Sequence, residues 1–488
     1  MPKGSRTLGL SAVFFGALLV GAGSAPAQQA LTLQQAIELA QRNGMAARAA
    51  ASTRDAARAR DRAFGARRLP QLSLGGNVPA YNRSIIPVLQ PDGTTLFRPQ
   101  QETNSNLNMI VTQQLPITGG FLSVSSRLTQ LKRSGTTSSE TWNSTPFSVA
   151  LTQPLLRSNA LAWDGREQTL RADAAEQQFL EAREDVALQT TAAFFDYFIA
   201  RTTLSNARVN AAVNDTLFRM NQGRFEVGKI GENDLGQSEL QLLRSRTSLD
   251  AARLEHDRTL AALRLVLNLR PNEPLDVTVS PEVPQFEADT LAAVEYALRN
   301  RATITDLRLQ DVQARRRISE TRFNNGMNAM LSASYGYNAT ASDVNLAYRD
   351  LANAQQLTLG VSIPLFRWGA NSADIQAARA EHDRITSNAT TAREQVRQEA
   401  HFAALQLAQS GRQLLLSAKA DTVARKRFEV AYNRYVIGRI PIDNLVLAQN
   451  DKDQALLAYV AALRGYWTAY YRLRKLTLYD FEQGSVLR

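Results

Sequence analysis

One stretch of twelve residues occurs twice in this chain of 488 residues, and it restricts the fold more than any other feature. Residues 224–235 read Arg-Phe-Glu-Val-Gly-Lys-Ile-Gly-Glu-Asn-Asp-Leu, and residues 434–445 read Arg-Tyr-Val-Ile-Gly-Arg-Ile-Pro-Ile-Asp-Asn-Leu. A Gly after one helical pattern, with Pro, Asp or Asn opening the next, is typical of a tight turn between two helices. A helix–helix turn explains each copy by itself. Two copies at a constant offset of 210 residues indicate a duplicated chain.

The residues around the two copies follow the same order in both halves. Each half has a short helical pattern, strand-like segments, a long helical pattern, the turn and a shorter helix. Ala293–Asn300 repeats the pattern of Ala36–Asn43, and Thr32 with Gln35 predicts a capping box at the first helix. The predicted repeats are 28–283 and 284–488, with helical ranges of about 31–68, 164–269, 287–323 and 371–477 and strand ranges of about 70–157 and 328–367.

The helical pattern from Asp164 to about Gln222 is longer than any ordinary globular domain requires. Apolar residues recur there at alternating steps of three and four, interrupted by Gln189 and Asn214. This spacing is typical of a coiled-coil seam. At 1.5 Å per residue the helix would be ~90 Å long. Two shorter helices together have about this length, so we expect them to stack end to end against it.

The strand-like segments alternate apolar residues with small polar ones. Leu357, Leu359 and Val361, for example, alternate with Thr358 and Gly360, which predicts strands with one apolar face. The first half has about 49 more residues between its strands than the second. Within them, 106–115 and 121–129 predict an additional hairpin. It either joins the sheet, giving six strands per chain, or lies outside it as a loop.

Composition excludes several classes of function. The chain has no cysteine, which excludes disulfides and thiol catalysis. His256, His382 and His401 lie in helical stretches without a partner at ligand spacing, and no phosphate loop or nucleophile elbow occurs. The net charge of +11 comes from bases spread among nearly as many acids, which does not indicate a nucleic-acid surface. We predict no enzyme activity, no cofactor, no metal site and no nucleic-acid partner.

Residues 1–27 have the pattern of a signal peptide. Lys3 and Arg6 precede an apolar run to about Gly23, and cleavage is expected between Ala27 and Gln28. The run is shorter than the roughly 20 residues of a spanning helix. No later stretch could span a bilayer as a helix, so a membrane crossing would require a closed β-barrel.

The strands of one chain are too few to close a barrel, and open strand edges in lipid leave backbone groups unpaired. The simplest solution is a three-fold ring of copies. We therefore expect an α+β membrane protein, in which a trimer forms a coiled-coil α-helical barrel continuous with a transmembrane β-barrel. The alternative is a periplasmic coiled-coil scaffold with a small β-domain and no pore. The alternating strands, which suit lipid outside and water inside, favour the barrel.

The chain resembles the TolC-type outer-membrane efflux proteins over the expected mature length. The resemblance rests on Leu31–Glu38, on the strand ends 152–156 and 362–366, and on both turns. It implies a homotrimer in the outer membrane of a Gram-negative bacterium, with a large periplasmic part. It further implies a passive exit duct for small molecules such as drugs, working with a periplasmic adaptor protein and, through it, an inner-membrane transporter. A channel for type I protein secretion is the alternative within the same class.

The resemblance also assigns residues to roles. The tips that meet the adaptor are Val227, Gly228, Lys229 and Ile230 in the first turn, and Ile437, Gly438, Arg439 and Ile440 in the second. Polar links holding the entrance closed would involve Asp234, Asn233 and Tyr435. The family carries acids at its narrowest constriction, but the matching positions here are Asn444 and Leu447, with Asp443 one residue earlier. Either Asp443 replaces the acid ring or the ring is absent.

Overall fold

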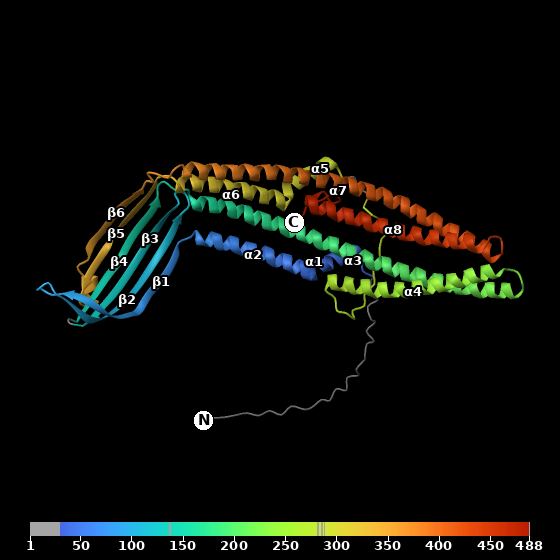
Figure 1. The fold of residues 1–488 in the computed structure, drawn as a ribbon, viewed down its shortest axis with the longest axis horizontal. Coiled ribbons are helices and arrows are strands. Elements are labelled where there is room, and N and C mark those ends of the chain that lie inside the picture. The colour runs from blue at the N-terminus through green and yellow to red at the C-terminus, as the bar shows by residue number, and fades with distance from the viewer. Residues whose placement is uncertain (1–29, 136–137, 281–282, 285, 287, 488) are drawn as a thin grey trace, which may run out of the picture.

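The computed structural model describes residues 30–135, 138–280, 283–284, 286 and 288–487. The molecule is elongated, with a β-sheet at one end and long helices that run from it to two helical turns at the other end (Figure 1). The expected signal peptide, with the cleavage site at Ala27 and Gln28, lies outside the described residues. Among the residues described, no helix combines the length and the apolar character needed to cross a membrane.

Four helix lengths occur twice, once in each half of the chain. The pairs are α1 and α5 with 11 residues, α2 and α6 with 23, α3 and α7 with 67, and α4 and α8 with 36. Their bounds are α1 Leu33–Asn43, α2 Met45–Arg67, α3 Ala160–Glu226, α4 Glu232–Leu267, α5 Thr290–Asn300, α6 Ala302–Asn324, α7 Ala370–Val436 and α8 Ile442–Thr477. At 1.5 Å per residue, α3 and α7 are each about 100 Å long.

Local sequence explains where the first helices begin and divide. The Thr32 hydroxyl accepts a hydrogen bond from the Gln35 amide at 3.3 Å, and the Gln35 side chain accepts one from the Thr32 amide at 3.0 Å. This confirms the predicted capping box. The helical stretch expected over 31–68 consists of two helices, because Gly44 has an extended backbone. Arg301 divides α5 from α6 with nearly the same backbone angles.

Six antiparallel strands form one sheet in the order β1-β2-β3-β4-β5-β6. They are β1 Gln71–Leu89, β2 Thr95–Leu115, β3 Gly120–Ser134, β4 Ser139–Pro154, β5 Asn328–Ala341 and β6 Ala352–Ser362. Strands β2 and β3 contain the segments predicted as an additional hairpin, and they pair with β1 and β4 on either side. The hairpin is thus part of the sheet. A short 3-10 helix, Leu346–Tyr348, lies between β5 and β6, and β7 Tyr479–Asp480 pairs with β8 Ser485–Val486 near the C-terminus.

The two faces of the large sheet differ in chemistry. Because directly opposed residues of antiparallel strands share a face, the register separates the side chains into two sets. Leu74 lies opposite Met109 on one face, while Gly75 lies opposite Asn108 on the other. We call the first the apolar face and the second the polar face. The apolar face includes Leu72, Leu107, Val111, Leu122, Val124, Phe147, Tyr335, Leu357 and Leu359, and the polar face includes Asn104, Asn106, Ser123, Ser125, Ser148, Ser332, Ser334 and Thr358.

Helix α3 is the centre of the helical layer. Near the sheet it packs against α2 on one side and α6 on the other, and α6 packs against α7. Towards the turns it packs against α4 on one side and α8 on the other, and α8 packs against α7 (Figure 1). Each level is therefore a row of four helices with two open edges, formed by α2 or α4 on one side and by α7 on the other.

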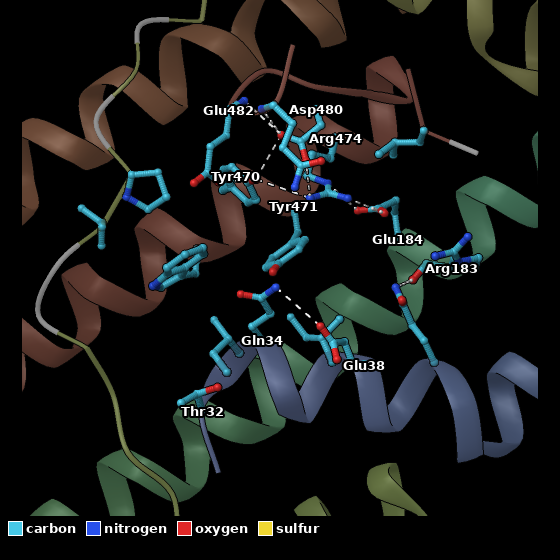
Figure 2. Close-up of a pocket in the computed structure, with 18 of the residues that line it drawn as sticks. Thr32, Gln34, Glu38, Arg183, Glu184, Tyr470, Tyr471, Arg474, Asp480 and Glu482 are labelled. Atoms are coloured by element: carbon cyan, nitrogen blue, oxygen red, sulfur yellow. Dashed lines mark hydrogen bonds and ion pairs between the residues drawn. The ribbon is translucent and has the colours of Figure 1, made fainter. Parts of the chain in front are cut away.

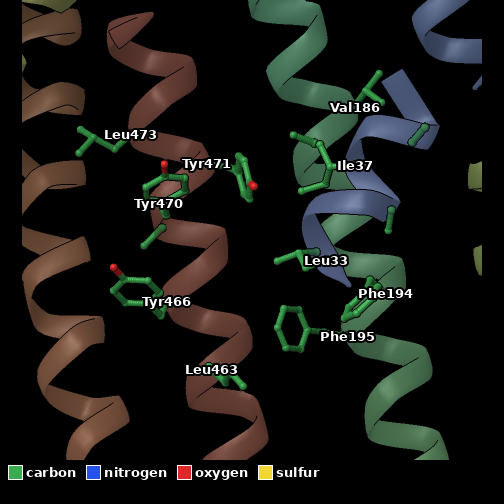
Figure 3. Packing of buried hydrophobic residues seen from close by; sticks show 14 of the residues in the cluster. Leu33, Ile37, Val186, Phe194, Phe195, Leu463, Tyr466, Tyr470, Tyr471 and Leu473 are labelled. Atoms are coloured by element: carbon green, nitrogen blue, oxygen red, sulfur yellow. The ribbon is translucent and has the colours of Figure 1, made fainter. Parts of the chain in front are cut away.

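The largest hydrophobic core lies midway along the molecule, where α1, α3, α4 and α8 meet. Phe194 and Phe195 of α3 are fully buried there with their rings edge to face at 5.6 Å (Figure 3). Leu263 of α4 and Leu463 of α8 are also buried. Burying a side chain of this size contributes about 1.5–3 kcal/mol. This core therefore stabilises the packing of the shorter helices α1, α4 and α8 against the long helix α3.

Candidate functional site: the two helical turns

The two turns share one backbone geometry. Gly228 has φ +69° and its amide donates to the Phe225 carbonyl at 2.9 Å, while the Lys229 amide donates to the Arg224 carbonyl at 2.8 Å. The second turn repeats these bonds 210 residues later, with φ +73° at Gly438. No atom lies within 4 Å of the place where a Cβ would stand at either glycine. Glycine is therefore required by the left-handed backbone and not by crowding.

Apolar side chains are exposed at both turns. Val227 is 67% exposed and Ile437 is 63% exposed, and both glycines and the basic residues after them, Lys229 and Arg439, are also exposed. Ile230 and Ile440 are half-buried. Large apolar side chains at the exposed end of a long helical pair have the chemistry of a contact surface.

Tyr435 is buried between the two helical pairs, with 5% exposure. Its hydroxyl donates a hydrogen bond of 3.0 Å to Oδ1 of Asn221 on α3. The Nδ2 of Asn221 is buried without a hydrogen-bond partner in the described part of the chain. Around this pair, Leu217, Ile442 and Leu445 form a small core. The predicted gate tyrosine thus links α7 to α3 within one chain.

Arg224 bridges the same two helical pairs. Its guanidinium donates to the Val436 carbonyl at 3.0 Å and lies 5.7 Å from the centre of the Tyr435 ring, within the distance of a cation–π contact. Arg224, Tyr435 and the predicted gate acid Asp234 line one cavity of about 420 Å³. The structure therefore places Asp234 and Tyr435 on the same cavity, at the ends of the two helical pairs.

The remaining predicted residues lie at the start of α4 and α8. Asp443 accepts a hydrogen bond from the Gln237 side chain of α4, so the acid one residue before the expected constriction position has a partner in the same chain. Asn444 and Asn233 are exposed, and Leu447 is 51% exposed. The positions matched to the acid ring thus present an amide and a leucine to the surface.

Asn221, Arg224 and Gln237 contact predicted residues but were not predicted from the sequence. Asn221 follows Asn214 by seven residues, and both are buried on the α3 seam. A polar residue that recurs at heptad spacing within an apolar seam is the sequence pattern that indicates a buried polar contact at Asn221. Arg224 has an equivalent in Arg434, which is exposed, so the repeat alone did not distinguish the two arginines.

A larger cavity of about 800 Å³ lies at mid-length, between α1, α3, α8 and the C-terminal residues (Figure 2). Arg474 lies there between Glu184 at 3.3 Å and Asp480 at 2.9 Å. Burial raises the pKa of the Glu184 carboxyl, and Arg474 opposes that rise. Because Arg474 forms ion pairs with two buried carboxylates, this cluster has the chemistry of a structural junction.

Neither the turns nor this cavity has the chemistry of a metal site. Among the residues that the structure describes, no group of three or more His, Asp or Glu side chains could hold a metal ion. His382 contacts Asp311 at 3.0 Å and the neighbouring Asp383 at 3.8 Å, and His256 contacts Asp257 at 2.9 Å.

Comparison with known proteins gives one curated relative and several solved structures. The chain is 22% identical over 330 residues to the outer membrane efflux protein BepC of Brucella suis biovar 1, covering 65% of this chain and 70% of BepC. It superposes on the CmeC outer membrane channel of Campylobacter jejuni with a TM-score of 0.64 and 15% identity, over 97% of this chain and 94% of CmeC. For the open MtrE outer membrane channel of Neisseria gonorrhoeae the TM-score is 0.62 at 14% identity, over 91% and 88% of the chains. No family model matches the chain.

These comparisons confirm the resemblance predicted from the turns and the strand ends. The matched proteins are outer-membrane efflux proteins and channels and not enzymes, in agreement with the prediction of no catalytic activity.

Proposed function

Since this chain has the fold of the TolC-type outer-membrane efflux proteins, we propose that three copies form the outer-membrane exit duct of a tripartite export system. The duct is passive and conducts small molecules, such as drugs and toxic compounds, from a periplasmic adaptor and an inner-membrane transporter to the outside. The observation that carries the proposal is a set of open edges that recurs on the same two sides at every level of the molecule.

The open edges support side-by-side assembly. Strands β1 and β6 are the two unpaired edges of the sheet, and α2, α4 and α7 are the open edges of the helical rows. A sheet edge presents unpaired backbone N–H and C=O groups, which cannot remain unpaired in lipid. Joining β6 of one copy to β1 of the next satisfies these groups and brings α7 beside α2 and α4 of the neighbour. A closed ring leaves no edge.

Helix α7 carries a seam suited to such a neighbour. Phe402, Leu416, Val423 and Val430 are all between 45% and 68% exposed. They lie at multiples of seven residues along α7, and Ile437 of the turn continues the series. Heptad spacing of apolar residues is the pattern by which helices pack as coiled coils. In one copy this stripe has no cover, so we assign it to the contact between copies.

The sheet end has the chemistry of a membrane-spanning segment. The apolar face suits lipid, and the polar face suits a water-filled lumen. Exposed large residues cluster where the sheet meets the helices: Ile117 at 95%, Leu365 at 89%, Phe366 at 73% and Trp368 at 90%. Aromatic and apolar residues at this level are typical of the girdle at a membrane–water interface. The helices would then extend into the periplasm, with the turns as adaptor-docking tips.

The gate belongs to the same proposal. Asp234, Asn233, Tyr435, Asp443 and Asn444 lie at the end of the helical rows, where a ring of copies would narrow. The bond from Tyr435 to Asn221 and the bond from Gln237 to Asp443 hold the two helical pairs together within each copy. Release of these bonds would let the pairs separate. Equal helix lengths in the two halves support the duplication, which supplies two pairs per copy.

Single-channel conductance in a planar lipid bilayer tests the proposal. The protein beginning at Gln28 should insert as a stable trimer and conduct, and Asp234→Ala and Tyr435→Phe should conduct more than the unaltered protein. Leu416→Asp with Val423→Asp should leave monomers that do not insert, whereas Leu291→Asp, at a position 78% exposed on α5, should not disturb the trimer. Folded trimers that never conduct would refute the duct and favour the periplasmic scaffold.

A second candidate, a channel for protein secretion, is favoured by the width of the sheet. Three copies with six strands each would close a barrel of eighteen strands. Barrel diameter grows roughly in proportion to strand number, and barrels of 16–18 strands leave an aqueous channel. Exclusion of polymers of graded size from the open pore distinguishes the candidates. Entry of polymers as wide as an extended polypeptide favours secretion, and their exclusion at the sheet end favours small molecules.

A further inference from the structure

The polar face of the sheet carries one isolated charge at mid-height. Arg127 lies at the middle of β3, seven residues from Gly120 and seven from Ser134. It is opposite Asn108 of β2 and Thr145 of β4. The pairing of β2 with β3 has no register shift from Gln101 to Leu115. Alternation therefore assigns Arg127 to the same face as Ser123, Ser125 and Thr129.

The neighbours of Arg127 on this face are neutral. Asn106 and Asn108 of β2, Ser125 and Thr129 of β3, and Asn143 of β4 surround it in the register. The Oδ1 atom of Asn108 is buried without a hydrogen-bond partner in the described chain. Arg127 itself is exposed and forms no ion pair with any residue that the structure describes. Its charge is therefore uncompensated.

The other charges of the strands are paired or lie elsewhere. The strands contain two acids: Glu102 pairs with Arg133 at 3.0 Å, and Glu140 pairs with Lys132 at 3.4 Å. Lys132 and Glu140 lie on the apolar face, and so does Arg83, which is opposite Gln101. Between the helix end of the described strands and the level of Glu102, Arg127 is the only charged side chain on the polar face.

We infer that Arg127 makes the outer-membrane section of the duct select for anions, an inference that rests on the proposed function. Three copies would place a ring of three guanidinium groups in a lumen that is otherwise uncharged between the helix end of the strands and the level of Glu102. Arginine stays charged at any physiological pH. A ring of one sign in a channel raises the local concentration of the opposite ion. Solutes carrying carboxylate, sulfonate or phosphate groups should pass more readily than cations of equal size.

Ionic strength sets the size of the effect. The Debye length is about 10 Å at 0.1 M salt and about 30 Å at 0.01 M. A charge on the wall of a wide lumen therefore influences only part of the cross-section at high salt and most of it at low salt. The preference for chloride over potassium should rise as the salt concentration falls.

Reversal potentials across a tenfold KCl gradient test the inference. The unaltered trimer should favour chloride. Arg127→Ala should lose most of this preference at low salt, and Arg127→Glu should favour potassium. Arg83→Gln removes the same charge from the apolar face and should change nothing. Arg127→Glu pores with the reversal potential of the unaltered protein would overturn the inference. Unaltered trimers that do not conduct would instead refute the proposed function.

A second experiment removes any effect of the substitution on folding. The chain has no cysteine, so Arg127→Cys provides one reactive thiol per chain, three in a trimer that has already inserted. In separate pores of this variant, a cationic methanethiosulfonate should restore the preference for chloride, and an anionic one should give a preference for potassium. If the cationic and the anionic reagent each modify the thiols but leave the same reversal potential, Arg127 does not face the lumen.

Discussion

At the first turn Phe225 is 40% exposed, whereas Tyr435 at the equivalent position of the second turn is 5% exposed. The turns nevertheless close with the same two hydrogen bonds and the same left-handed glycine. Leu445 is 1% exposed, while its equivalent Leu235 is half-buried. Arg224 bridges to the other helical pair, and Arg434 is exposed. The backbone is thus repeated and the side-chain environment is not.

The unequal burial of the two turns shows which contacts are completed within a single copy. The second helical pair packs its inner side onto α3 through Tyr435 and Leu445, so the second turn has its partner within the chain. In the first pair, α3 makes the contact with the second pair. The outer helix α4 remains exposed, with Leu240 at 47% and Leu243 at 53% exposure. Under the proposed assembly, the α7 seam of the next copy would cover that side.

The largest effect is expected when both turns are made bulky. Gly228→Trp with Gly438→Trp places a large side chain on two exposed tips, and a left-handed backbone costs a non-glycine residue about 1–2 kcal/mol. This cost is too small to unfold the protein, but under the proposed function the bulky tips could no longer meet the adaptor. Export by whole cells should be lost while trimers remain in native electrophoresis. Each single variant should retain part of the export, which would show that the two tips contribute separately.

The control for this experiment lies at the opposite end of the molecule. Gly93 has φ +82° and open space around its Cβ position, as at the two tips. Gly93→Trp should therefore carry the same backbone strain without affecting export. If cells that carry Gly228→Trp with Gly438→Trp still export, the assignment of the turns as adaptor-docking tips is wrong.

Exchanging the aromatic residues at positions 225 and 435 tests whether the buried environment of Tyr435, and not its place in the repeat, gives it an effect on stability and conductance. Tyr435→Phe leaves Asn221 without a partner for either of its polar atoms. The loss should destabilise the contact between the two helical pairs by about 1–3 kcal/mol and, if the proposed gate is correct, increase conductance. Phe225→Tyr, at the exposed equivalent, should change stability by about 0.5 kcal/mol or less. Thermal unfolding and single-channel conductance measure both effects.

A combined variant separates the hydrogen bond from the packing. Tyr435→Phe with Asn221→Leu replaces both polar partners by apolar groups, and such replacement can be nearly neutral for stability. Stability should recover towards that of the unaltered protein. If Tyr435→Phe alone costs nothing, the buried hydrogen bond does not hold the two helical pairs together.

The smallest effect is expected for the two arginines. Arg224→Ala removes the bond to the Val436 carbonyl and the contact with the Tyr435 ring, and a cation–π contact at such a site contributes about 0.5–1 kcal/mol. Arg434→Ala removes the same charge from an exposed site. Conductance should rise modestly for the first variant and remain unchanged for the second. Equal responses would mean that the net charge of the entrance, and not the bridge, sets conductance.

The sequence could predict whatever depends on local chemistry or on periodicity. The left-handed glycines, the capping box at Thr32, the long α3 and the alternating strands all follow from residue types at fixed spacing. The additional hairpin was predicted as a hairpin, but its place in the sheet depends on pairing with β1 and β4, which local pattern does not specify. The Tyr435–Asn221 bond joins residues 214 apart in the chain. Such a contact depends on the relative rotation of two helices, and a shift of one residue turns a side chain by ~100°.

The hairpin of β2 and β3 also bears on how such a protein changes over evolutionary time. A hairpin contributes one strand in each direction, so its insertion leaves the direction of the flanking strands unchanged and preserves every connection to the helices. In a three-fold assembly, one inserted hairpin per gene becomes six strands in the barrel wall. The helical rows would keep their width, because the insertion lies wholly between α2 and α3. Under the proposed function, the membrane end of the duct could thus be enlarged in a single genetic step, independently of the end proposed to meet the partner proteins.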